Sequence, residues 1–513
     1  MKKISFLISI SLCLLLVNKS NAQINTPSTG VNWNMDSLVA NYPLDVQFSN
    51  NEYLVTQKII FKANDTFSET QNHIVKFSSN GTFEFNQSVV DIDVDSQMMW
   101  IAADTTLSFP RIKFDQAVSS NVKNLAVNYS NGISVINCDV NFSNLNMEKT
   151  YHKSPNPSGA LSALNSNISV DSSRFFESQR SAIALGANSG ASVNITNSWF
   201  EHNDYSNGNY PQVNIGTTNS NGAIIDGCTF IGKYTKSGGL AFLNISGSNF
   251  DVLVQNNYFY QNRYGIALNG RGINATILNN VIDSNNIEGL PMLGGSGINI
   301  LGDSSINVIA ANNEISRNLW GVTIQKNASA PKAPIVSFGK INPTNPIDTG
   351  GNYFWANEND STLFAIYNNT PDTVYAQRNR WDFEIVDSIE TTIFHHFDDS
   401  TLGWVLYDSF YVTPPEPPVD TSTGITSILK KGNFAQLFPN PTTGKNQTLN
   451  ILSAIPLKEM RVIDLQGREV MHKILNNEKE TFLSIDQFET GLYWIWLTNG
   501  QEQQFLRWSV IKE

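Results

Sequence analysis

A short apolar pattern recurs along the middle of the chain and constrains its fold more than any other feature. It consists of an apolar residue, any residue, a second apolar residue, two mostly polar residues, a small Asn, Ser or Cys, any residue, and a third apolar residue. The second apolar positions of the copies are Val135, Val170, Ile195, Ile225, Val254, Ile277, Ala310, Thr349 and Ala376. Their spacing, about 23 to 39 residues, is typical of solenoid repeats.

A second short apolar segment lies between copies of this pattern. It reads Gly-Ile-Ala-Leu at residues 265–268, and related segments stand at 182–185, 297–300 and 321–324. Both segments alternate with a period of two, which is the period of a β-strand. Each repeat therefore contains at least two strands and a turn. The sequence predicts a parallel β-solenoid in which the apolar residues of successive coils form one continuous core.

The small Asn, Ser or Cys of each copy is expected at the turn between two strands. Examples are Asn257, Asn280 and Asn313. Asn tolerates the left-handed backbone region, and its amide can bond to the equivalent amide one coil away. This role accounts for the high Asn content of the chain.

The best copy joins an Asn-x-Phe turn at residues 257–259 to the Gly-Ile-x-Leu strand at 265–268. With these motifs, residues from about 125 to 385 resemble the right-handed parallel β-helix repeat family. The resemblance implies that residues 23–124 form N-terminal coils and that residues 125–412 contain the repeats and a C-terminal cap.

The N-terminus has the features of a signal peptide. Lys2 and Lys3 precede an apolar run at residues 4–17, and a small-x-small site ends at Ala22. Cleavage is predicted after Ala22, which would remove residues 1–22. The apolar run is shorter than a membrane-spanning helix and no later stretch is long enough, so no transmembrane segment is expected.

The C-terminal part begins with a linker. Residues 413–435 are rich in Pro, Thr and Ser and are expected to be extended. Residues 436–513 resemble the C-terminal sorting domain of type IX secretion cargo. The residues that carry this resemblance are Pro439, Asn440, Pro441, Asp464, Gly467, Arg468, Gly491 and Tyr493. The resemblance implies that the type IX secretion machinery is a partner, that the protein is secreted or held at the outer cell surface, and that surface lipopolysaccharide is a candidate partner.

Together these features predict an all-β chain, with a right-handed parallel β-helix followed by a small β-sandwich-like sorting domain. Only 15% of the residues are charged and the formal net charge is −12, which argues against a nucleic-acid-binding protein.

Cys138 and Cys228 would remain after signal-peptide removal. The repeat places them about three coils apart, too far for a disulfide, so both are expected to be buried thiols.

No zinc-binding or phosphate-binding motif stands in the sequence, and neither a metal nor another cofactor is expected. The pair His395 and His396 comes nearest to a metal motif. Adjacent residues on a strand point to opposite faces, so the pair is interpreted as part of the structural cap.

Candidate catalytic residues are few. The outward positions of the Gly-Ile-x-Leu strands, such as Asn299 and Thr323, are small and uncharged, so that face lacks the paired carboxylates of a glycoside hydrolase. A lyase needs a base near a charge-neutralising group. Arg263, His202 and Asp204 are weak candidates, since Asp204 and Arg263 would lie two coils apart and could flank a sugar. The alternative is that all three are solvated turn residues.

Large aromatic residues recur just before the inward aromatic position of the repeat. Trp199, Tyr258 and Tyr353 are therefore predicted to point outward, and exposed rings are suited to stacking on sugars. The alternative is that an insertion such as residues 206–211 covers them.

Three functions remain open at this point. The first is a non-catalytic secreted or cell-surface protein that binds polysaccharide or another surface. The second is a polysaccharide lyase or glycoside hydrolase, and the third is a structural adhesin stalk. An enzyme should show a charged cleft across several coils, whereas a binding protein should show an aromatic or amide-rich strip.

Overall fold

The computed structural model describes residues 23–411 except 156, 188, 217, 246 and 247, and in the tail residues 435–438, 442–443, 448–464, 468–500 and 503–511. The predicted signal peptide, almost all of the linker, and Pro439, Asn440, Pro441 and Gly467 lie outside the described residues. The chain divides into two compact units, Met1–Pro414 and Pro415–Glu513.

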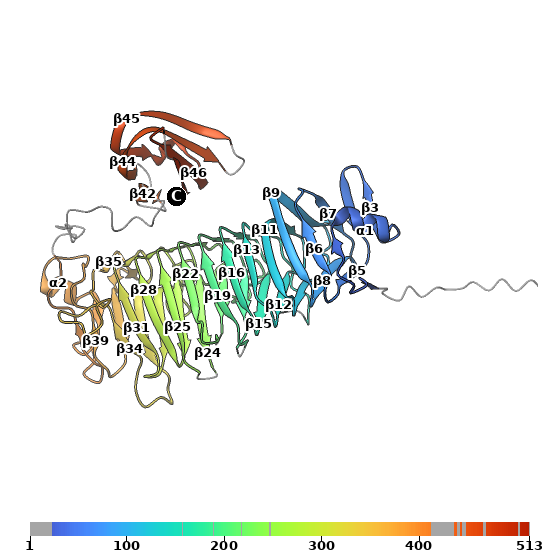
Figure 1. The fold of residues 1–513 in the computed structure, drawn as a ribbon. Helices are drawn as coiled ribbons and strands as arrows, with labels where there is room; N and C mark the ends of the chain where they lie inside the picture. The colour runs from blue at the N-terminus through green and yellow to red at the C-terminus, as the bar shows by residue number, and fades with distance from the viewer. Residues whose placement is uncertain are drawn as a thin grey trace, which may run out of the picture. The chain divides into compact units, whose positions relative to one another are not determined.

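The first unit is a parallel β-solenoid whose coils stack side by side (Figure 1). Its first sheet has 14 strands, each parallel to its neighbours. In order these are β1 (Ile24–Asn25), β5 (Lys58–Phe61), β8 (Thr82–Asn86), β10 (Ile112–Asp115), β12 (Ile133–Ile136), β15 (Leu161–Leu164), β18 (Ile183–Leu185), β21 (Val213–Ile215), β24 (Leu240–Asn244), β27 (Ile266–Gly270), β30 (Ser296–Gly302), β33 (Trp320–Lys326), β38 (Ile366–Asn369) and β40 (Ile393–Phe394).

The remaining strands of the coils form two further rows. The second row is β2 (Asn32–Trp33), β6 (Thr66–Glu69), β9 (Val89–Ala102), β11 (Ser119–Asn128), β13 (Val140–Ser143), β16 (Asn167–Asp171), β19 (Ser192–Thr196), β22 (Ala223–Asp226), β25 (Phe250–Gln255), β28 (Ile273–Leu278), β31 (Asn307–Ala311), β34 (Ile335–Ser337), β39 (Val374–Tyr375) and β41 (Val405–Leu406). The third is β3 (Val46–Ser49), β4 (Glu52–Val55), β7 (Ile74–Phe77), the second halves of β9 and β11, β14 (Asn146–Glu148), β17 (Arg174–Phe176), β20 (Trp199–Glu201), β23 (Thr229–Ile231), β26 (Tyr258–Tyr260), β29 (Val281–Asp283), β32 (Glu314–Ser316) and β35 (Tyr353–Trp355).

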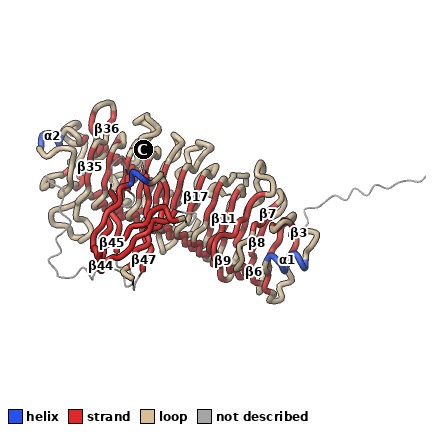
Figure 2. Tube along the Cα trace, turned by 90° about the horizontal axis from the view of Figure 1, so that it is seen from above, coloured by secondary structure: helices blue, strands red, loops and turns tan. Residues whose placement is uncertain are grey.

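Short elements close the solenoid. Helix α1 (Met35–Asn41) and helix α2 (Val386–Glu390) lie at its opposite ends (Figure 2), and a hairpin of β36 (Glu358–Asn359) and β37 (Thr362–Leu363) projects near α2. The described residues include no helix long and apolar enough to span a membrane. His395 is buried in the second cap, where its Nδ1 accepts from the backbone N–H of Val405 at 2.9 Å.

The core consists of apolar residues that repeat once per coil. Phe175, Phe200, Phe230 and Phe259 stack in series with ring centroids 5.2, 4.9 and 4.6 Å apart. All four rings are fully buried. Stacked aromatic pairs add about 0.5–1.5 kcal/mol each to the burial of their surface, so this column ties successive coils together.

A ladder of buried amides runs beside this column. The side-chain nitrogen of Asn257 donates to Asn280, that of Asn280 to Asn313, and that of Asn313 to Asn352, each to the Oδ1 at 2.9 Å. The coil-to-coil amide contacts expected from the sequence are therefore present. The left-handed residue, however, is the one before each ladder residue, such as Asn256 with φ 58°, so the ladder residue itself has ordinary backbone.

A second ladder was not predicted. It follows the first at an interval of five residues and includes Asn262, Asn285, Asn318 and Asn357, each buried and each bonded to the next. The signal in the sequence is the recurring Asn-x-x-x-x-Asn.

The predicted register is correct from Val170 to Ala310 but wrong at two other copies. Val135 pairs with Ala163 in the first sheet, and Val170 pairs with Phe142 instead. Each coil has three strands, and the same apolar pattern also fits the corner between the first and second strands. The copy at Thr349 is wrong as well, because the strand paired with β31 is β34, which ends 15 residues before Asn352.

The two cysteines of the solenoid, Cys138 and Cys228, are buried thiols and are not joined to each other by a disulfide, as predicted. The second unit is a sheet in the order β42 (Ala435–Phe438), β44 (Thr448–Asp464), β46 (Gly491–Thr498), β47 (Gln503–Ile511) and β43 (Thr442–Thr443). Its strands are antiparallel except for the parallel pair β43 and β47. Strand β45 (Glu469–Ser484) pairs with β44, and a 3₁₀ turn at Ile485–Gln487 follows it.

Candidate functional site

The outward face of the first sheet carries one residue per coil in a continuous row. By strand register the row runs Ser134, Ser162, Ala184, Asn214, Ala241, Ala267, Asn299, Thr323, Tyr367 and Phe394. Its members are small up to Thr323 and aromatic after it. A pocket lies where this change occurs.

The pocket has a volume of about 390 Å³. Its floor is the outward row at Asn299 and Thr323, and one wall is the loop between β29 and β30. The lining residues are Arg263, Tyr264, Pro291, Met292, Leu293, Gly294, Ser296, Asn299, Trp320, Thr323, Gln325, Tyr367 and Asn369. A volume above 300 Å³ is typical of sites that hold small molecules.

Aromatic rings form one side of this pocket. The ring of Trp320 lies 4.6 Å from Phe364 and 5.0 Å from Tyr367, measured between centroids. Its Nε1 donates to the carbonyl oxygen of Pro291 at 3.1 Å, which joins the indole to the loop wall. The Tyr367 ring stacks in turn on Phe394, at 4.6 Å and an interplanar angle of 13°. Because each ring is packed against another, their orientations are fixed before any ligand arrives.

The polar lining is made of neutral groups. Asn299, Gln325 and Asn369 supply side-chain amides, each with donors and an acceptor. Ser296 and Thr323 lie with their hydroxyl oxygens 3.0 Å apart. The lining residues include no Asp, Glu, His or Lys.

Arg263 is the one charged residue of that lining. Its Nε donates to the carbonyl oxygen of Leu293 at 2.7 Å, and a second guanidinium nitrogen contacts Oδ1 of Asn209. The structure thus places this sequence candidate at the rim, where it links two loops.

Asp204 has a different role from the one considered for it. The carboxylate is fully buried and accepts from the backbone N–H groups of Gly208 and Tyr210 at 3.0 Å each, and from the hydroxyl of Ser206 at 2.9 Å. Burial raises the pKa of Asp204 despite these hydrogen bonds. The side chain closes its own turn, so it does not stand free to flank a sugar opposite Arg263.

His202 belongs to another neighbourhood. Its ring centroid lies 5.8 Å from that of Phe176, and its Nδ1 lies 3.9 Å from a carboxylate oxygen of Glu201. Burial lowers the pKa of His202, and the charge of Glu201 partly opposes that shift. The structure brings Arg263 and the Asp204 turn together through Asn209, but it places His202 beside the third row of strands.

The predicted exposure of the Trp199 and Tyr258 rings is wrong. Only 4% of Trp199 and 1% of Tyr258 is exposed. Two hydrogen bonds fix the position of this indole. Nε1 of Trp199 donates to a carboxylate oxygen of Glu201 at 3.0 Å, and Arg174 donates to the same oxygen. A ring buried to this extent presents no open face for a sugar.

Tyr353, the third aromatic candidate, is half-buried. The guanidinium of Arg380 lies 4.3 Å from its ring centroid, and the ring stacks on Trp355 at 5.9 Å. One ring face is therefore already occupied by a cation.

The sequence analysis did not identify Trp320 and Tyr367, the two aromatic residues that line the pocket. Tyr367 would have followed from extending the outward row by one coil through the segment Ala365-Ile366-Tyr367.

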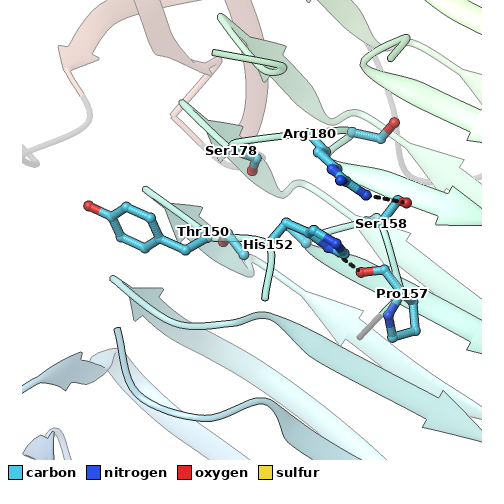
Figure 3. A pocket seen from close by; sticks show the side chains of 10 residues that line it. Thr150, His152, Pro157, Ser158, Ser178 and Arg180 are labelled. Carbon is cyan, nitrogen blue, oxygen red and sulfur yellow. Dashed lines mark hydrogen bonds between the residues drawn. The ribbon is translucent and has the colours of Figure 1, made fainter. Parts of the chain in front are cut away.

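A second recess lies at the same edge of the first sheet, several coils away (Figure 3). There Arg180 donates to the hydroxyl of Ser158 at 3.2 Å, and Nδ1 of His152 lies 3.4 Å from the carbonyl oxygen of Pro157. The recess has no internal space for a water molecule. The buried hydroxyls of Thr150, Ser178 and Ser181 have no hydrogen-bond partner there, but the recess is filled by protein atoms and leaves no room for a ligand.

Comparison with known proteins agrees with this architecture. Residues 112–318 match the family model described as a right-handed β helix region, and residues 436–512 match a secretion system C-terminal sorting domain. A crystal structure of a double mutant of the periplasmic alginate epimerase AlgG is similar, at 11% identity over 74% of this chain and 84% of that chain, with a TM-score of 0.29. No curated protein matches the chain.

The sorting domain implies export and a secreted or cell-surface location. It equally implies an interaction with the secretion machinery. The chain therefore contains a right-handed parallel β-helix region and a type IX secretion C-terminal sorting domain.

Proposed function

We propose that this exported solenoid binds a glycan without cleaving it, in the pocket between Trp320 and Asn299. The observation that carries the proposal is the composition of the pocket. Half-buried rings, side-chain amides and hydroxyls line it, with one guanidinium at its rim.

This combination suits a sugar. The C–H faces of a pyranose pack on aromatic rings, while its hydroxyl groups both donate and accept hydrogen bonds. Asn299, Gln325 and Asn369 can do both as well. Since Trp320 and Tyr367 are already held by neighbouring rings, little side-chain entropy is lost on binding.

The same lining argues against the enzyme alternatives. A glycoside hydrolase needs two carboxyl groups beside the scissile bond, and a lyase needs a base. The described residues around the pocket supply no carboxyl group, and Nε of Arg263 is already bonded to Leu293. Burial raises the pKa of Tyr264 to about 12, which makes this tyrosine a poor base at neutral pH. These groups favour retention of a glycan over its chemical conversion.

The test is a glycan panel applied to the purified full chain. It includes neutral and acidic polysaccharides and records retention, new reducing ends and the absorbance of unsaturated uronates. We expect retention without products, and Trp320→Ala should weaken it about tenfold, since roughly 1.4 kcal/mol corresponds to a factor of ten.

Tyr375→Ala is the matched control for Tyr367→Ala. Tyr375 lies on β39 in the second row, is 37% exposed, and packs under Lys340 with its ammonium 4.5 Å from the ring centroid. Binding should survive in the control and weaken in the Tyr367 variant. Products that disappear on substituting Arg263 would make the protein an enzyme, and retention equal in all variants would place the site elsewhere.

A further inference from the structure

We infer that the pocket receives the end of a glycan chain and excludes its internal stretches. This inference rests on the proposed function and adds the orientation in which a glycan chain enters the pocket. The outward row of the first sheet is closed at one end of the pocket and open at the other.

The closed end is an aromatic wall. Tyr367 and Phe394 are register partners on neighbouring strands, with centroids 4.6 Å apart and planes at 13°. Neighbouring strands are themselves about 4.8 Å apart, so the two rings are stacked along the direction in which the coils follow one another. Rings stacked in that direction stand upright on the sheet. The face of Tyr367 that is turned away from Phe394 is therefore directed toward β33, where the ring meets Trp320 and lines the pocket.

Packing keeps this wall in place. Trp320 lies against both Phe364 and Tyr367, and Phe394 supports Tyr367 from behind. Rotating Tyr367 out of the way would break its stack with Phe394 and its contact with Trp320. A sugar chain that enters over Asn299 meets a ring face instead of a passage.

Toward the N-terminal coils, the side chains of the outward row are small. From the pocket toward the N-terminal coils its members are Ala267, Ala241, Asn214 and Ala184, and none is larger than Asn. A bound chain can thus continue over these coils. The path between Ala184 and Thr323 covers five strand steps, or about 24 Å.

Arg111 ends this path on the N-terminal side of Ala184. The buried guanidinium of Arg111 lies across the next part of the row, donating to the hydroxyls of Ser134 at 2.6 Å and Ser162 at 2.8 Å. The side chain that fills these positions leaves no room for a sugar. The open row therefore has a fixed length, and a short oligosaccharide fills it.

End-modified oligosaccharides test the inference. The glycan retained in the panel is cut to defined lengths, and a bulky group is attached to the reducing end in one series, to the non-reducing end in a second, and to both in a third. We expect one single modification to weaken binding at least tenfold and the other to be tolerated. Affinity should rise with length until the row is filled and then stay constant, with one protein bound per chain.

Two variants make the result independent of folding defects. The double variant Tyr367→Ala with Phe394→Ala removes the wall. It should bind all chains more weakly than the unmodified protein binds open ones, but it should bind doubly blocked and unblocked chains equally. Ala241→Phe places a ring across the row and should reduce the affinity of long oligosaccharides to that of the shortest ones.

The outcomes separate the two proposals. Binding of doubly blocked chains by the unmodified protein, lost in Trp320→Ala, would overturn end recognition and keep the glycan site. Several protein molecules bound along one long chain would overturn it in the same way. Failure to bind any glycan would overturn both.

Discussion

The carboxylate of Asp464 accepts from the Arg468 backbone N–H at 2.9 Å and from its Nε at 2.7 Å. Tyr493, another residue of the sorting motif, donates from its hydroxyl to the carbonyl oxygen of Glu489 at 3.0 Å and packs its ring against Trp508. Asp464 and Tyr493 are therefore buried structural residues of the sorting domain, whereas the Arg468 side chain is largely exposed.

Substitutions of Asp464 and of Arg468 should differ in how much they destabilise the tail. The Arg468 side chain is 76% exposed, so its ion pair is worth less than about 1 kcal/mol and Arg468→Ala should be mild. Asp464→Ala also leaves a backbone N–H without its acceptor and should destabilise the tail by about 1–3 kcal/mol. Hydrogen exchange of the full chain, read separately for tail and solenoid, measures both. Equal costs for the two variants would contradict the assignment.

The amide ladder predicts a strong asymmetry between two asparagines of strand β28 and the turn after it. Asn280 is 1% exposed and donates to Asn313 from both its backbone and its side chain. Asn280→Ala should cost about 2–4 kcal/mol, because several buried groups lose partners. Asn274 is exposed and its side-chain amide donates to the carboxylate of Asp251, so Asn274→Ala should change the free energy of unfolding by no more than about 0.5 kcal/mol. Guanidinium denaturation compares the two.

The first coils should loosen in acid. Asp65 is fully buried and accepts from the backbone N–H groups of residues 28–31 at 3.0 Å each. Burial alone would raise the pKa of Asp65, but these hydrogen bonds and one from Thr26 together lower it below the ordinary 3.8. The folded state therefore prefers the ionised form.

It follows that the stabilisation by Asp65 is complete above pH 3.8 and is lost as the pH falls through the lower folded-state pKa. Proteolysis of residues 23–40 by an acid-active protease should accelerate below that pH. Asp65→Asn should make the same segment protease-sensitive at neutral pH and remove the acid dependence. A segment equally protected at all pH values in both proteins would disprove this role.

The buried arginine should not tolerate lysine. Arg111 is 6% exposed and donates to four backbone carbonyl oxygens and two serine hydroxyls on the two following coils. A lysine has three donors on one atom and cannot reach all six acceptors. We expect Arg111→Lys to cost about 2–4 kcal/mol by chemical denaturation. Lys123→Ala, which removes an exposed ion pair with Asp93, should leave stability unchanged.

The repeat made most of the solenoid predictable, because a polar ladder and an apolar column recur in the sequence once per coil. The copies from Val170 to Ala310 are in register for this reason. The copy at Val135 failed because the corner between the first and second strands has the same pattern as the corner that holds the ladder.

The pocket was less predictable because it depends on departures from the repeat. Tyr367 stands in a coil whose strand lacks the Gly-Ile-x-Leu motif, and Trp320 precedes that motif by one residue. Exposure was equally hidden. The outward position on its strand suggested that the Trp199 ring would be exposed. The ring is buried instead, and its Nε1 donates to Glu201 of the same strand.

The amide ladders also determine how such a protein can change in length. Because each ladder residue bonds its equivalent in the next coil, duplication or loss of one whole coil preserves every such bond, whereas a one-residue change within a coil breaks the series at that point. Duplication of the coil that contains Asn257 and Ala267 would add one small residue to the outward row and leave Tyr367 in its place. The number of sugars accommodated could then evolve in unit steps, independently of the residues that grip the terminal one.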